Sequence, residues 1–115
     1  MDETTGAIGS SAFSPLDRHF AAFVERRAGG ARPALALAAA LVSLRRGEGH
    51  SCLDLEAMAG TLFPNPPVEG EKPVRLPGLK SWLRDLENAS VVGNAEAAAP
   101  LVLDSHHRLY LHRYW

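Results

Sequence analysis

The sequence predicts an α+β domain that is mostly helical, with about four helices, one short strand and a C-terminal β-hairpin. Three observations lead to this prediction. Apolar residues recur at helical spacing over residues 14–46 and again over 79–87, five prolines interrupt any regular pattern between residues 64 and 77, and apolar residues alternate along the last strand. Helices packed on a small antiparallel sheet are typical of the α+β class. The expected order of elements resembles a winged helix with one extra helix.

The first helix is expected to begin after Ser14 and to end before the Gly29–Gly30 pair. Ser14 is a favourable N-cap, Pro15 suits the first helical position, and Asp17 follows the cap by three residues, as a capping box requires. The spacing i, i+4, i+7 and i+8 predicts one buried apolar face, made of Leu16, Phe20, Phe23 and Val24. Residues 1–13 are expected to form a flexible lead-in, so that the domain spans residues 14–115.

The second helix is predicted from Pro33 to about Arg46 and is apolar nearly all round. A helix without a polar face is usually covered on several sides, so we expect this helix to be central. The predicted core around it consists of Phe20, Phe23, Leu41, Trp82 and Leu83.

A short strand is predicted over residues 50–55, followed by a short third helix over 55–63 that Asp54 caps. The five prolines predict an exposed irregular loop over residues 64–77. A fourth helix is expected over residues 79–87, with its apolar positions at helical spacing. A Gly- and Ala-rich connection over residues 93–99 leads to the terminal hairpin.

The hairpin is predicted to consist of a strand over residues 101–103, a polar turn over 104–107 and a last strand over 108–115. Successive side chains of a strand point to opposite faces. Two leucines favour the first face as the one that meets the core, and this face carries Leu109, Leu111, Arg113 and Trp115. The opposite face carries Tyr110, His112 and Tyr114.

Composition and charge exclude some classes of function. A length of 115 residues and a formal charge of −1 fit one small domain without a general electrostatic attraction to nucleic acid or anionic membranes. Cys52 is the only cysteine, so no internal disulfide is possible. The N-terminus lacks the basic and apolar regions of a signal peptide, and the longest apolar stretch, residues 33–44, is too short to span a bilayer. We therefore expect a cytoplasmic protein without membrane contact.

The residues offer little catalytic chemistry. A phosphate-binding loop needs G-x-x-x-x-G-K-[ST], and neither Lys72 nor Lys80 follows such a loop. His106, His107 and His112 are potential metal ligands, but neighbouring residues of a strand point apart, and His50 with Cys52 supplies only two ligands. Cys52 fits a small core residue better than a nucleophile. We expect no catalytic, cofactor-binding or metal-binding residue in this chain.

Two kinds of binding remain open. If the domain were a winged helix that reads DNA, the helix over residues 55–63 would enter the groove, but it contains Glu56 and no Lys or Arg. Arg108, His112 and Arg113 in the hairpin supply more positive charge. The alternative is a protein interface, because aromatic residues are the usual anchors of such surfaces. The candidate interface residues are Tyr110, His112, Tyr114 and Trp115, although these rings could equally complete the core.

The sequence resembles a known family. The stretches "LAAALVSLRRGEGHSCLDL" and "PLVLDSHHRLYLHRYW", together with "SPLDRHFAAFV", are similar to the N-terminal region of RecD, the alpha subunit of exodeoxyribonuclease V (the RecBCD helicase–nuclease). The similarity runs from about Ser14 to Trp115. Its most specific parts are "GEGHSCLDL" at 47–55 and "RLYLHRYW" at 108–115.

The resemblance implies a function that the residues alone do not show. The family's full-length subunit is an ATP-dependent 5′–3′ DNA helicase that acts in double-strand-break repair and homologous recombination, with ATP and magnesium as its cofactors. The N-terminal domain docks this motor onto the RecC subunit, in a complex that also contains RecB and acts on DNA. The motor is expected to follow Trp115. None of the family's catalytic positions falls within these 115 residues, so the resemblance implies an enzyme only for the full-length subunit.

Overall fold

The computed structural model describes residues 7–89, 91–93 and 99–111. The fold is α+β, as the sequence predicts. The helices are α2 (Pro15–Arg27), α3 (Pro33–Gly47), α4 (Leu55–Met58) and α5 (Leu79–Glu87). The strands are β1 (Leu53–Asp54), β2 (Leu62–Phe63), β3 (Val74–Arg75), β4 (Val92–Gly93), β5 (Leu101–Leu103) and β6 (Arg108–Leu111).

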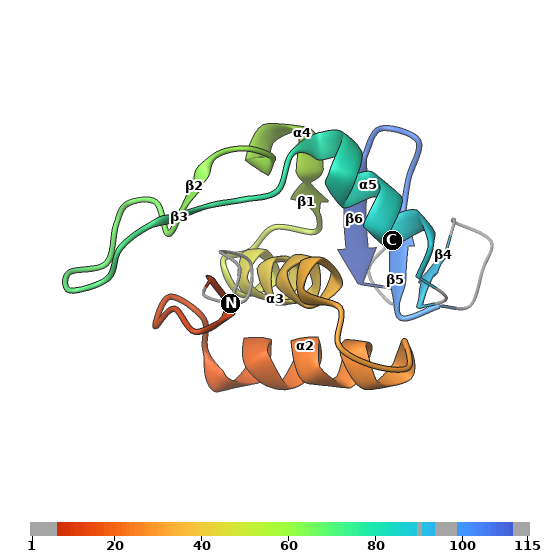
Figure 1. Cartoon of the computed structure of the whole chain (residues 1–115), viewed down its shortest axis with the longest axis horizontal. Coiled ribbons are helices and arrows are strands. Elements are labelled where there is room, and N and C mark those ends of the chain that lie inside the picture. The colour runs from red at the N-terminus through yellow and green to blue at the C-terminus, as the bar shows by residue number, and fades with distance from the viewer. Residues whose placement is uncertain (1–6, 90, 94–98, 112–115) are drawn as a thin grey trace.

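Helix α3 forms the middle layer of the molecule. Helix α2 lies along one side of it, while α5 and the strands β5 and β6 lie on the other side (Figure 1). Every residue from Leu35 to Val42 is buried, which agrees with the central position predicted for this helix. Its alanines allow the neighbouring elements to approach closely. The indole Nε1 of Trp82, on α5, donates a hydrogen bond to the carbonyl oxygen of Ala34 at 3.0 Å and joins the two helices.

Helix α2 begins with the predicted capping box. The backbone N–H of Asp17 donates to Oγ of Ser14 at 3.2 Å, and the backbone N–H of Ser14 donates to Oδ2 of Asp17 at 2.8 Å. The other oxygen of the Asp17 carboxylate accepts a hydrogen bond from Oγ of Ser43, on α3, at 2.6 Å. The cap therefore fixes both the start of α2 and the side of the helix that faces α3.

The predicted apolar face of α2 is wrong in part. Val24 is fully buried, but Leu16 is 66% exposed and Phe23 is 38% exposed. The residues that face α3 include Asp17 and Ala21, which come one residue after Leu16 and Phe20 of the predicted face. The small side chain of Ala21 permits a close approach to α3, and the bond from Ser43 holds the face that carries Asp17 inward.

Because α2 turns a different side toward α3 than predicted, the predicted core also changes. Leu41 and Trp82 are fully buried, and Phe20 and Leu83 are partly buried against the core, as expected. Phe23 does not belong to the core, because it lies on the exposed side of α2.

The main sheet has the strand order β1-β6-β5-β4. β5 and β6 form the predicted antiparallel hairpin, with Leu101 opposite Leu111, and β1 pairs antiparallel with β6, with Leu53 opposite Leu109. The strand predicted over residues 50–55 is only two residues long. The sequence prediction missed β4, which pairs in parallel with β5 at the start of the predicted Gly- and Ala-rich connection.

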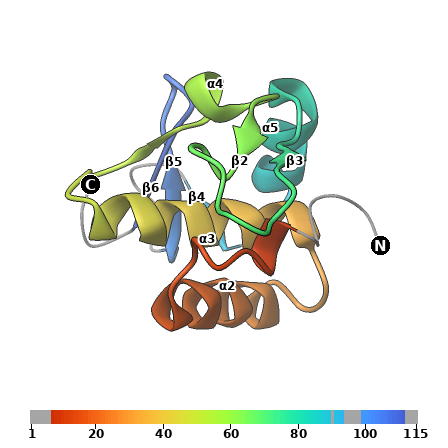
Figure 2. The ribbon, with the colours of Figure 1, turned by 90° about the vertical axis from the view of Figure 1, so that its left-hand side faces the viewer.

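The third helix and the proline-rich loop also differ from the prediction. α4 ends at Met58 instead of Phe63, because Ala59 is extended (ψ 134°) and Gly60 has a positive φ of 74°, which ends the helix. Residues 62–63 instead form β2 and pair with β3, so the segment predicted as an irregular loop contains one strand of a two-stranded arm. The arm reaches out to the left in Figure 1, away from α5, and Figure 2 views the molecule from that side.

Residues 7–13, which were expected to form part of a flexible lead-in, pack against the domain. Ala7 and Phe13 are buried, and the ring of Phe13 stacks on Phe63 of the arm with 4.9 Å between ring centroids. Glu71 accepts hydrogen bonds from Oγ of Ser10 at 2.6 Å, from the backbone N–H of Ser11 at 2.9 Å, and from the Ser11 hydroxyl. The bonds from Ser10 and Ser11 hold the pKa of Glu71 below its usual value. The N-terminal segment is thus attached to the loop that connects β2 and β3.

Candidate interaction surface

The turn of the β5–β6 hairpin is organised by the carboxylate of Asp104. Its Oδ1 accepts the backbone N–H groups of His106 and Arg108, each at 2.9 Å. Its Oδ2 accepts Nε of Arg108 and the hydroxyl of Tyr110, each at 3.0 Å. Burial acts to raise the pKa of Asp104, but these hydrogen bonds outweigh it and lower the pKa below the usual value. The ionised carboxylate therefore holds the turn together.

Tyr110, a candidate interface residue, lies partly buried at this turn. Burial and the bond to Asp104 raise its pKa, so the hydroxyl stays a neutral donor that is already engaged within the domain. Leu109 is fully buried and Leu111 is partly buried against the core, so the described part of their face meets the core as predicted. The other three candidates, His112, Tyr114 and Trp115, lie outside the described residues. The proposed interface role of these four residues remains a prediction.

His107 joins the hairpin turn to α4. Its φ is 61°, and its carbonyl oxygen accepts the backbone N–H of Leu55 at 3.0 Å. Its Nδ1 is buried and lies 3.4 Å from Oε2 of Glu56, but the geometry does not form a hydrogen bond. Oδ1 of Asp54 accepts the backbone N–H of Glu56 at 3.0 Å and so caps α4, as predicted. The turn and the helix end thus support each other.

This arrangement does not provide a helix suited to reading DNA. α4, which takes the place of the predicted recognition helix, has only four residues. Its charged residue is Glu56, which would repel phosphate.

Among the described residues, the potential metal ligands considered above do not form a site. Cys52 is partly buried and His50 is exposed. In the part of the chain that the structure describes, no group of three or more His, Cys, Asp or Glu side chains is placed to hold a metal ion.

Comparison with known families identifies the domain. The model of the family described as "RecBCD enzyme subunit RecD, N-terminal domain" matches residues 10–110, a range that includes every element from α2 to β5 and most of β6. The chain belongs to the RecD N-terminal domain family. Among curated proteins, no match to the chain was found. The resemblance that the sequence shows is therefore confirmed at the level of the family.

Apolar side chains line a groove on the surface of this RecD N-terminal domain. A groove of about 430 Å³ lies between α3, α4 and β2, with Leu44, Met58 and Leu62 among its lining residues. Arg45 and Glu48 also line it, and they pair with each other at 3.2 Å. Within the described residues, no helix has the length and apolar character needed to cross a bilayer.

The sequence prediction missed the exposed apolar residues of this RecD N-terminal domain. Leu16 and Phe23 on α2 and Leu62 on β2 are the large apolar side chains that the described residues leave open to solvent. The helical spacing showed that Leu16 and Phe23 share a side of α2. It did not show that this side faces away from α3.

Proposed function

We propose that this chain is the subunit-docking domain of the alpha subunit of exodeoxyribonuclease V, and that it attaches the subunit to RecC. The observation that carries the proposal is the match of residues 10–110 to the RecD N-terminal domain family, whose description places RecD in the RecBCD enzyme. The exposed apolar side chains of Leu16 and Phe23 on α2 support it, because such residues anchor protein interfaces.

In this proposal the domain contributes assembly, and the full-length subunit contributes catalysis. The full-length subunit is an ATP-dependent 5′–3′ DNA helicase that acts with RecB and RecC in double-strand-break repair and homologous recombination in the cytoplasm. ATP and magnesium bind to its motor region. The 115 residues contain no G-x-x-x-x-G-K-[ST] sequence, so we assign them no nucleotide-binding or catalytic residue.

Binding of the purified chain to purified RecC tests the proposal. Isothermal titration calorimetry should detect a complex, and the chain alone should hydrolyse no ATP with or without DNA. A chain that is folded by circular dichroism but does not bind RecC would overturn the docking function. Sequence-selective DNA binding at nanomolar concentration would favour a nucleic-acid-binding domain instead.

A further inference from the structure

One side of α2 carries a row of large side chains, of which only Phe20 packs against the core. Leu16, Phe20, Phe23 and Arg27 follow one another at i, i+4, i+7 and i+11, the spacing that places residues on one side of a helix. We call these four residues the α2 stripe. Leu16 is 66% exposed and Phe23 is 38% exposed, while Phe20 is partly buried.

Three of the four side chains of the α2 stripe contact one another. The rings of Phe20 and Phe23 stack with 6.4 Å between centroids. The guanidinium carbon of Arg27 lies 5.7 Å from the centroid of the Phe23 ring, within the range of a cation–π contact. Side chains that are already positioned lose less conformational entropy when a partner covers them. The stripe is therefore a better docking surface than three scattered apolar residues would be.

The charges on α2 are unequally placed. Both of its carboxylates are engaged within the domain: Asp17 accepts the hydroxyl of Ser43, and Glu25 accepts the backbone N–H of Arg32 at 2.7 Å. The remaining ionisable side chains of the helix are basic and exposed, and they are Arg18, His19, Arg26 and Arg27. The surface of α2 is thus apolar and basic, although the chain as a whole has a net charge of −1.

We propose that the α2 stripe docks an acidic amphipathic helix of the partner subunit. Three apolar residues over two helical turns fit the i, i+4, i+7 anchors of an opposing helix. Carboxylates beside the anchors of that helix would pair with Arg26 and Arg27. The inference rests on the proposed docking function. It adds which face of the domain contacts RecC and what kind of RecC segment binds there. The apolar centre of the stripe favours a protein partner over nucleic acid, whose phosphates need cations.

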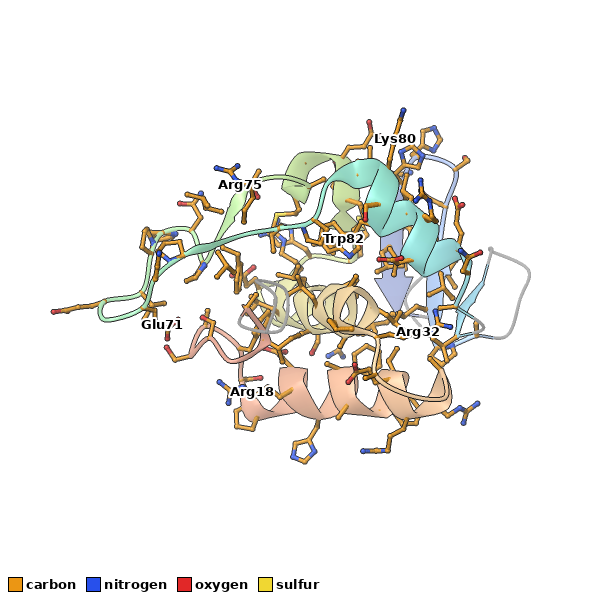
Figure 3. All side chains as sticks on the ribbon, viewed as in Figure 1. Arg18, Arg32, Glu71, Arg75, Lys80 and Trp82 are labelled. Carbon is orange, nitrogen blue, oxygen red and sulfur yellow. The ribbon has the colours of Figure 1, made fainter. Side chains whose placement is uncertain are left out.

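Two double variants test the proposal against RecC, each with a matched control. Leu16→Ala with Phe23→Ala removes the apolar anchors, and Leu62→Ala removes an apolar residue of the β2–β3 arm that is 47% exposed. Arg26→Glu with Arg27→Glu reverses two charges on α2. Lys80→Glu with Arg84→Glu makes the same change on α5, which lies on the other side of α3 (Figure 3). Circular dichroism and the melting temperature show whether each variant is folded.

Either α2 variant should weaken the affinity for RecC by about tenfold or more, while each control stays within about twofold of the unchanged chain. The affinity of the unchanged chain should also fall with added salt, and that of the charge-reversed α2 variant should depend on salt less. If one α2 variant is unfolded, the other still decides the result.

Three other outcomes would overturn the inference. If folded α2 variants bind RecC as tightly as the unchanged chain does, the stripe is not the docking face, although the docking function stands. If the unchanged chain does not bind RecC, the docking function itself fails, and the inference fails with it. If the unchanged chain binds an oligonucleotide at physiological salt and the charge-reversed α2 variant does not, the stripe is a nucleic-acid surface.

Discussion

Replacing Trp82 with alanine should destabilise this domain more than most single changes, because the indole is fully buried and joins α5 to α3. Trp82 has no exposed surface, and its Nε1 donates to the carbonyl oxygen of Ala34 at 3.0 Å. Truncation of a buried Trp to Ala removes most of a large apolar side chain, leaves a cavity and typically costs about 3–5 kcal/mol. A small domain has a free energy of unfolding of about 5–15 kcal/mol, so the loss would be a large fraction of the total.

A second substitution separates packing from hydrogen bonding. Trp82→Phe keeps an aromatic ring in the core but removes the indole N–H. The lost hydrogen bond is worth about 1 kcal/mol, and the smaller ring leaves a modest void, so we expect a total loss of about 2 kcal/mol. Lys80→Ala on the exposed side of α5 is the control, and it should change the free energy of unfolding by no more than about 0.5 kcal/mol.

Equilibrium unfolding in urea, followed by circular dichroism, measures these differences. The Trp82→Ala variant should unfold at a much lower urea concentration, and its melting temperature should fall by about 10 °C or more. A folded Trp82→Ala variant with an unchanged melting temperature would show that the indole is not part of the core. Equal losses for the alanine and phenylalanine variants would show that the hydrogen bond, and not packing, dominates.

The other predictions concern the α2 cap, the hairpin turn and the last strand. Asp17→Ala should lower the free energy of unfolding by about 2 kcal/mol, because it leaves the backbone N–H of Ser14 and the hydroxyl of Ser43 without their acceptor. Ser43→Ala removes only one of these bonds and should cost about 1 kcal/mol. Equal losses in urea unfolding would contradict this. The pKa of Asp104 is lowered by folding, so its ionised form stabilises the domain above the unfolded-state pKa of about 4, and this stabilisation is lost as the pH falls through the lower folded-state pKa. Asp104→Asn should therefore remove part of the acid sensitivity of the melting temperature, and an unchanged pH profile would refute the assignment. Replacing Tyr110 and Tyr114 together with Ser tests whether the last strand provides a second contact with RecC besides the α2 stripe: assembly in a pull-down should weaken while the chain stays folded, and normal assembly would remove this second face from the interface.

Features that depend on neighbouring residues were predicted correctly. The capping box of Ser14 and Asp17, the central helix α3 and the β5–β6 hairpin all follow from patterns within a few residues. A cap, a helical repeat or a strand alternation acts through atoms that the chain itself brings close. The family resemblance also rested on short stretches, and the match over residues 10–110 confirms it.

The errors occur where the outcome depends on distant segments. Residues 62–63 continue a helical pattern locally, but pairing with residues 74–75 makes them a strand, and Phe63 stacks on Phe13. β4 was missed for the same reason, because its two residues become a strand only through pairing with β5. Short apolar runs fit more than one structure, and a distant partner decides between them.

The sequence by itself determined the fold class, the family, the start of α2, the central position of α3 and the lack of a phosphate-binding loop. The tertiary structure alone decided which side of α2 faces inward. The bond between Asp17 and Ser43 and the small side chain of Ala21 hold that side against α3, and this leaves Leu16 and Phe23 in solvent. The helical period shows which residues share a side. The direction in which that side points depends on what the rest of the chain packs against it.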